Sequence, residues 1–136
     1  MPTVLLDTCA IIYIANGDPV HAMAKREIIS AVLDGGLLVS PVSAWEIGML
    51  AARKGIAFLP DPAIWFQTFL GRTGIRLTPL TPEAAISASF LPPPVHGDPA
   101  DRLLLATARM LDVPIVTRDR LILAYAAAGH VKAVSC

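Results

Sequence analysis

The chain has 136 residues, 54% of them hydrophobic and 16% charged, which excludes a disordered protein and fits one domain of about 150 residues. Eleven basic and eleven acidic side chains give a formal net charge of zero, so an anionic partner has to bind a local patch rather than bulk positive charge. No uncharged stretch reaches the ~18–20 residues of a membrane span, and the N-terminus lacks a signal-peptide pattern. The two cysteines are too few for a disulfide framework. We therefore expect a cytoplasmic protein.

The elements predicted in chain order are short apolar strands separated by helices. The strands are expected at residues 3–6, 37–39, 75–77, 114–116 and 131–134. None of these segments alternates between apolar and polar residues, which is typical of strands buried on both faces. Strands connected through helices form parallel sheets with right-handed crossovers. The sequence therefore predicts a single domain over residues 1–136, with three layers in the order α/β/α.

Proline and glycine mark the ends of the predicted helices. A capping residue followed by proline, a usual helix start, occurs at Asp18-Pro19, Asp61-Pro62, Thr81-Pro82 and Asp98-Pro99. Three helices are expected to end at glycines, namely Gly35, Gly55 and Gly129. Helices that follow strands begin at the carboxyl edge of the sheet, where ligands bind in folds of this kind.

Five acidic residues are predicted to meet at this edge. Asp7 ends the first strand, Glu46 lies in the first turn of the helix after the second strand, and Asp119 follows the fourth strand. Asp98 and Asp101 open the helix that leads into the fourth strand. Carboxylates packed together repel one another unless a cation joins them, and oxygen ligands without a His/Cys cluster suit Mg²⁺ or Mn²⁺. Such an ion activates water for attack on a phosphodiester, so the acidic edge points to nuclease chemistry.

Most of these acids also have a structural interpretation. Ser43 and Glu46 have the spacing of a capping box, with Ser43 as the N-cap and Glu46 at position N3. Asp98 is suited to be the N-cap of the helix that it opens, and Asp101 lies in the first turn of that helix, where acids are favoured. Asp119 is suited to cap the last helix.

Asp7 is the acid with the weakest structural interpretation. It follows a fully apolar strand, and Thr8 is able to perform any capping that the next helix needs. The coincidence of all five acids at one edge therefore favours a functional site.

Other side chains are weaker candidates for chemistry. The three histidines do not have the spacing of metal ligands: His21, His96 and His130. Aromatic residues at helical spacing are expected in the core or at a dimer surface, and they are Trp45, Trp65, Phe66 and Phe69. Arg53 and Lys54 suit the end of a helix. Three arginines adjoin predicted site acids and are candidates for binding phosphate: Arg102, Arg118 and Arg120.

Four segments are similar, in order, to the successive motifs of PIN-domain ribonucleases: LLDTCAII, SPVSAWEIG, HGDPADRLLLATA and PIVTRD. More narrowly, the chain resembles the VapC-type toxins of bacterial and archaeal toxin–antitoxin pairs. The resemblance covers nearly the whole chain. It implies an α/β/α fold with strand order 3-2-1-4-5 and a Mg²⁺-dependent endoribonuclease, a hydrolase of RNA phosphodiester bonds.

The resemblance also implies roles for individual residues. The four catalytic acids of the family match Asp7, Glu46, Asp101 and Asp119. Asp7 and Asp101 are expected to bind the metal directly. The expected water-mediated or accessory ligands are Glu46, Asp119 and Asp98. Residues expected to face the substrate are Arg102, Arg118 and Thr117.

The expected cofactor is Mg²⁺, with Mn²⁺ able to substitute and no nucleotide cofactor. The expected partners are an RNA substrate, a cognate antitoxin and a second copy in a homodimer. The dimer is also expected because the segments IIYIA and AIWFQTFL offer more apolar surface than a small sheet covers. Two alternatives stay open: a non-catalytic PIN-like module that binds RNA or protein, and a Mg²⁺-dependent phosphatase, which needs a second acid where Cys9 stands.

Overall fold

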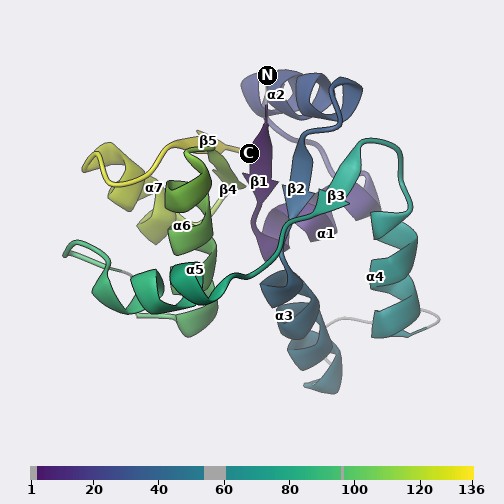
Figure 1. Ribbon diagram of the computed structural model, residues 1–136. Helices are drawn as coiled ribbons and strands as arrows, with labels where there is room; N and C mark the ends of the chain where they lie inside the picture. The colour runs from purple at the N-terminus through teal and green to yellow at the C-terminus, as the bar shows by residue number, and fades with distance from the viewer. Residues whose placement is uncertain (1–2, 54–60, 96) are drawn as a thin grey trace.

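The computed structural model describes residues 3–53, 61–95 and 97–136, in which a parallel sheet lies between two layers of helices (Figure 1). The strands are β1 (Val4–Leu6), β2 (Leu37–Val39), β3 (Ile75–Leu77), β4 (Ile115–Thr117) and β5 (Ala133–Ser135). The helices are α1 (Thr8–Asn16), α2 (Ala22–Leu33), α3 (Pro41–Ala52), α4 (Pro62–Leu70), α5 (Pro82–Ser87), the 3-10 helix η1 (Ala88–Phe90), α6 (Pro99–Leu111) and α7 (Arg120–Ala127). The strand order β3-β2-β1-β4-β5 confirms the predicted fold.

The central strand β1 distributes its side chains between the two helical layers. Leu5 pairs with Leu38 of β2 on one side and with Ile115 of β4 on the other, and all of these pairings are parallel. Successive side chains of a strand point to opposite faces, so Val4 and Leu6 enter one layer and Leu5 enters the other.

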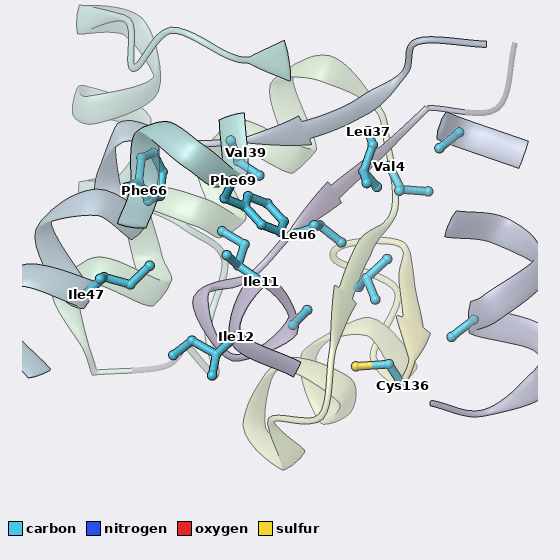
Figure 2. Close-up of a cluster of buried hydrophobic side chains, with 14 residues drawn as sticks. Val4, Leu6, Ile11, Ile12, Leu37, Val39, Ile47, Phe66, Phe69 and Cys136 are labelled. Carbon is cyan, nitrogen blue, oxygen red and sulfur yellow. The ribbon is translucent and has the colours of Figure 1, made fainter. Parts of the chain in front are cut away.

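One hydrophobic core lies between the sheet and helices α1, α2 and α4. Figure 2 shows the side chains of Ile11, Phe66 and Phe69 packed around Leu6 and Val39. All five are buried. Much of the apolar surface of the segments IIYIA and AIWFQTFL is therefore buried in this core. The sequence had instead predicted that this surface is available for a dimer.

A second core lies on the opposite face, against α6, α7 and η1. Leu104, Leu105 and Ile122 are fully buried there beside Leu5 and Ile115. In Figure 1, α5, α6 and α7 lie together on one side of β1, and α4 lies on the other.

The edge strands are less buried than predicted. The residues of β1, β2 and β4 are buried throughout, but those of β3 and β5 are half-buried or exposed. An edge strand has a neighbour on one side only, and here the helices cover the middle of the sheet more completely. The prediction of burial on both faces is wrong for these two strands.

Three of the four predicted helix starts are confirmed, because Asp61, Thr81 and Asp98 cap α4, α5 and α6. The start at Asp18-Pro19 is wrong, since α2 begins at Ala22. The backbone N–H of Asp18 donates to the carbonyl of Tyr13, so Asp18 completes the end of α1 after Gly17, which has a φ of 72°.

The ends of the helices agree better with the sequence prediction. Gly35 and Gly129 follow α2 and α7 as expected, and both have a positive φ. Lys54, Gly55 and His96 lie outside the described residues. None of the helices in the described ranges combines the length and hydropathy of a membrane-spanning segment.

Candidate active site

A hollow of about 290 Å³ lies beside the carboxyl ends of β1 and β4, and we name it the acidic hollow. Its walls contain all five acids that the sequence placed at this edge. The lining residues are Asp7, Thr8, Cys9, Tyr13, Glu46, Asp98, Asp101, Arg118 and Asp119. The described lining therefore carries five carboxyl groups and one guanidinium group.

Asp7 is fixed at the bottom of the acidic hollow by two hydrogen bonds. Its Oδ1 accepts from the backbone N–H of Ala10 at 2.8 Å, and its Oδ2 accepts from the hydroxyl of Thr117 at 2.5 Å. Asp7 is thus the N-cap of α1, which corrects the expectation that it has no capping duty. Burial raises the pKa of Asp7 to about 6, although both hydrogen bonds act in the opposite direction.

Thr117, at the end of β4, connects two of the acids. Besides donating to Asp7, its hydroxyl oxygen accepts from the backbone N–H of Asp119 at 2.9 Å. The carboxylate of Asp119 in turn caps α7 by accepting from Leu121 and Ile122, as predicted. Thr117 is fully buried, so its place is behind the carboxylates rather than at a surface open to substrate.

Glu46 reaches the hollow from the second turn of α3, not from the first. Ser40 caps this helix by accepting from the N–H of Val42, and Pro41 is its first residue. The predicted capping box is therefore wrong, and Ser43 is instead a buried residue inside the helix. Burial raises the pKa of Glu46, which accepts a hydrogen bond from Thr8.

Thr8 joins the first helix to the third. Its hydroxyl donates to the Glu46 carboxylate and lies 3.0 Å from the Ser43 hydroxyl oxygen. Both hydroxyl groups are buried. This contact fixes the distance between the acids that α1 and α3 carry into the hollow.

Asp98 and Asp101 enter the hollow from the first turn of α6. Asp98 is the N-cap and accepts from the N–H of Ala100 at 3.2 Å, and Asp101 stands three residues later, both as predicted. Carboxylate oxygens of Glu46, Asp98 and Asp101 all lie within 4.8 Å of one another. Burial raises the pKa of Asp101 to about 8, and the charges of Asp98, Glu46 and Asp119 add to the effect.

The donor set of the acidic hollow fits a hard divalent cation. Every acidic ligand is a carboxylate, and oxygen is the donor that Mg²⁺ and Mn²⁺ prefer. A cation among these groups favours their charged forms and so offsets the raised pKa values of Asp7, Glu46 and Asp101.

The candidate phosphate-binding arginines are placed differently. Arg118 lines the acidic hollow, where its guanidinium stands 3.9 Å from the centre of the Tyr13 ring and donates to the Pro19 carbonyl at 2.6 Å. Arg102 donates through Nε to the carbonyl of Ala88 at 3.0 Å. Neither Arg102 nor Arg120 is among the described residues that line the hollow.

Sequence reasoning missed part of the site. Among the lining residues, Thr8, Cys9 and Tyr13 are not predicted as site residues from the sequence. Thr8 had a signal, because a hydroxyl directly after a strand-ending acid lies at the same edge as that acid. Tyr13 had none, because its contact with Arg118 joins residues that are far apart in the chain.

A five-stranded parallel sheet in the order β3-β2-β1-β4-β5, with acids gathered at the ends of β1 and β4, defines a PIN-type fold. The family model of the PIN domain matches residues 4–134. The chain therefore belongs to the PIN domain family, which confirms the resemblance found in its motifs.

Individual relatives agree with this assignment. Ribonuclease VapC22 of Mycobacterium tuberculosis is 34% identical over 121 residues, which are 88% of this chain and 89% of the relative. The crystal structure of VapBC2 from Rickettsia felis, bound to a DNA fragment of its promoter, matches with a TM-score of 0.68, 12% identity and 98% coverage of each chain. DNA-bound VapBC from Salmonella typhimurium matches with a TM-score of 0.66, 16% identity and coverage of 99% and 98%. At such identities the two structures show the shared fold.

Proposed function

We propose that this chain is a Mg²⁺-dependent endoribonuclease toxin that hydrolyses RNA phosphodiester bonds in the acidic hollow. The observation that carries the proposal is the cluster of Glu46, Asp98 and Asp101 carboxylates in one hollow with Asp7 and Asp119. The name of the VapC22 relative adds RNA as the substrate.

Asp7 and Asp101 would bind the ion directly, and Glu46, Asp119 and Asp98 would serve as water-mediated or accessory ligands. A bound Mg²⁺ lowers the pKa of a coordinated water and offsets charge on the phosphodiester, and Mn²⁺ serves in the same way. The protein holds the carboxylates rigidly, because each of the acids Asp7, Asp98 and Asp119 is also the N-cap of a helix.

The three residues expected at the substrate, Arg118, Thr117 and Arg102, have different proposed roles. Arg118 lines the hollow and offers a guanidinium to phosphate. Thr117 is a positioning residue, since it acts through Asp7 and Asp119. Arg102 contacts the Ala88 carbonyl, and its role toward substrate stays a prediction.

The proposed partners follow from two solved structures of the same fold, which are of VapBC proteins bound to DNA. We infer a cognate antitoxin that covers the acidic hollow, a homodimer, and a place in the cytoplasm. Phe90 and Leu33 are 80% and 79% exposed, so apolar contact surface is present outside the two cores.

The test is a cleavage assay on a pool of single-stranded RNA. Cleavage is expected in Mg²⁺ and is expected to stop in EDTA or after Asp7→Asn, which keeps the helix cap but removes a charge. Asp61→Asn is the matched control, because Asp61 also caps a helix, through Ile64, but lies outside the hollow. Binding of RNA without any metal-dependent cleavage identifies the non-catalytic alternative and overturns the proposal.

A further inference from the structure

A second hollow, of about 480 Å³, adjoins the acidic hollow and shares Arg118 with it. The described residues that line it are Pro19, Val20, His21, Arg118 and Cys136. We name it the basic hollow, because the guanidinium of Arg118 and the imidazole of His21 line it, and none of its described lining residues has a carboxylate side chain.

The two hollows differ in what they attract. Five carboxylates in the acidic hollow repel a phosphate unless a metal ion joins them, whereas the basic hollow presents the Arg118 guanidinium and the His21 imidazole to an anion. An RNA chain carries a phosphate at every nucleotide, so a strand with one phosphate in the acidic hollow has to place its neighbours nearby. The basic hollow is the adjoining surface whose chemistry suits such a neighbour.

Arg118 is held in place at the boundary of the hollows. Its guanidinium stacks on the Tyr13 ring at 3.9 Å and donates to the Pro19 carbonyl at 2.6 Å. A guanidinium fixed in this way loses little conformational freedom on binding phosphate. The contact with Pro19 holds the loop after α1, which carries Pro19, Val20 and His21 of the basic hollow.

His21 is the second donor of the basic hollow. It is exposed and precedes α2, and its side chain makes no capping hydrogen bond to that helix. The ring is therefore not needed to cap α2, and a ring N–H is a suitable donor to a phosphate oxygen. Pro19 and Val20 add apolar surface for the sugar of the same nucleotide.

We propose that the basic hollow is a binding subsite for the phosphate next to the one that is cleaved, with His21 and Arg118 as its donors. This inference rests on the proposed function, because RNA is the assumed occupant. It adds His21 and the loop after α1 to the substrate-binding surface.

The test measures the affinity of a 12-nucleotide single-stranded RNA by fluorescence anisotropy, in Mg²⁺ and in an Asp7→Asn background that prevents cleavage. Arg118→Gln is expected to raise the Kd roughly tenfold or more, as loss of a charged hydrogen bond does. It is also expected to lower the salt slope of log K by about 0.7, the value for one phosphate contact on a single strand. His21→Ala is expected to raise the Kd about threefold to tenfold.

Arg72→Gln is the matched control, because Arg72 also stands over an aromatic ring, that of Phe69 at 5.2 Å, but lines neither hollow. Its Kd is expected to stay within twofold of the parent. Circular dichroism melting of each variant separates lost contacts from lost folding.

Two results overturn the inference. If His21→Ala leaves the Kd unchanged while Arg118→Gln weakens binding, phosphate meets Arg118 in the acidic hollow only. If Arg72→Gln weakens binding as much as Arg118→Gln, the effect is one of overall charge. Cleavage by the wild-type chain, measured separately on the same RNA, reports on the proposed function and not on this subsite.

Discussion

The hydroxyl of Thr117 donates to Asp7 Oδ2 at 2.5 Å, and the two residues are 110 positions apart in the chain. This contact joins the ends of β1 and β4, which are neighbours in the sheet. Because the same hydroxyl also accepts from the N–H of Asp119, one buried side chain sets the positions of two acids. Thr117 therefore links the sheet register directly to the geometry of the acidic hollow.

Replacing Thr117 by valine tests this link, since the shape is kept and the hydroxyl is lost. The hydrogen bond from Thr117 lowers the pKa of Asp7, so its loss raises that pKa above about 6. The acid limb of the pH–rate profile for RNA cleavage is expected to move to higher pH. The half-buried N–H of Asp119 also loses its acceptor, which costs about 1 kcal/mol of stability.

Thr107→Val is the control for this variant. Thr107 is also buried, its hydroxyl donates to the Leu103 carbonyl within α6, and it is not among the described residues that line the acidic hollow. The control is expected to leave the pH–rate profile unchanged. Equal shifts of the profile in both variants contradict the role given to Thr117.

Stability of the metal-free protein is expected to fall as pH rises. The pKa values of Asp7 and Asp101 are raised from 3.8 to about 6 and about 8, so both groups keep a proton in the folded chain after the unfolded chain has lost it. The free energy of unfolding then decreases with pH between about 4 and 8. We expect the Tm in EDTA to be at least about 3 °C lower at pH 8 than at pH 5.

Mg²⁺ is expected to reverse this trend by binding the ionised carboxylates of the folded state, so its effect on Tm is larger at pH 8 than at pH 5. Asp101→Asn is expected to remove much of the pH dependence seen in EDTA. Asp112→Asn, at an exposed carboxylate paired with Lys132 at 2.9 Å, is the control and is expected to preserve it. A metal-free Tm that rises from pH 5 to pH 8 contradicts the prediction.

Cys9 provides a chemical probe of the acidic hollow. The thiol is exposed, yet burial of its surroundings and the charges of Asp7, Glu46, Asp101 and Asp119 raise its pKa to about 11. The fraction of Cys9 present as thiolate is then about a hundredfold lower than it is at the ordinary pKa. The higher nucleophilicity of a thiolate with a raised pKa offsets part of the resulting loss of reaction rate. Alkylation by iodoacetamide at pH 8 is expected to be roughly tenfold slower than for an unperturbed cysteine.

Asp7→Asn or saturating Mg²⁺ removes negative charge near Cys9, so either is expected to speed its alkylation. Mass spectrometry of peptides separates Cys9 from Cys136, which is 2% exposed. If neither change alters the rate at Cys9, the carboxylates do not act on this thiol as the structure indicates.

The strand positions and the clustering of the five acids were predictable from the sequence, because apolar segments and capping residues mark where each strand ends and each helix begins. The order of the strands followed from the family motifs and not from composition. For α3 the sequence carries two competing signals, Ser40-Pro41 and the Ser43…Glu46 spacing. The structure uses the first, which is the same signal that marks α4, α5 and α6 correctly.

The contacts behind the acids were not predictable. Thr117 meets Asp7 only because β1 and β4 pair in one register, and Thr8 meets Glu46 only because α1 packs beside α3. The basic hollow likewise depends on the path of the loop after α1. Local patterns report which residues lie at an edge of the sheet, whereas these contacts depend on how distant elements pack.

Asp98 and Asp101 share the first turn of α6 but are expected to differ in role. Asp98 caps the helix, whereas Asp101 stands at the third position, in the cluster with Glu46. Asparagine caps a helix about as well as aspartate, so Asp98→Asn removes a charge and keeps the cap, and Asp98→Ala removes both. At pH 8 in EDTA, Asp98→Ala is expected to melt roughly 3–5 °C below Asp98→Asn, which corresponds to about 1 kcal/mol.

Asp101→Asn is expected to raise the metal-free Tm at pH 8, because it removes a carboxylate that burial and three neighbouring acids destabilise. The same change is expected to abolish cleavage, since Asp101 is proposed to bind the ion directly. Asp98→Asn is expected to retain measurable cleavage, as an accessory ligand does. An inactive Asp98→Asn beside an active Asp101→Asn means that the two acids exchange these roles, and Asp98 then holds the ion while Asp101 supports the helix.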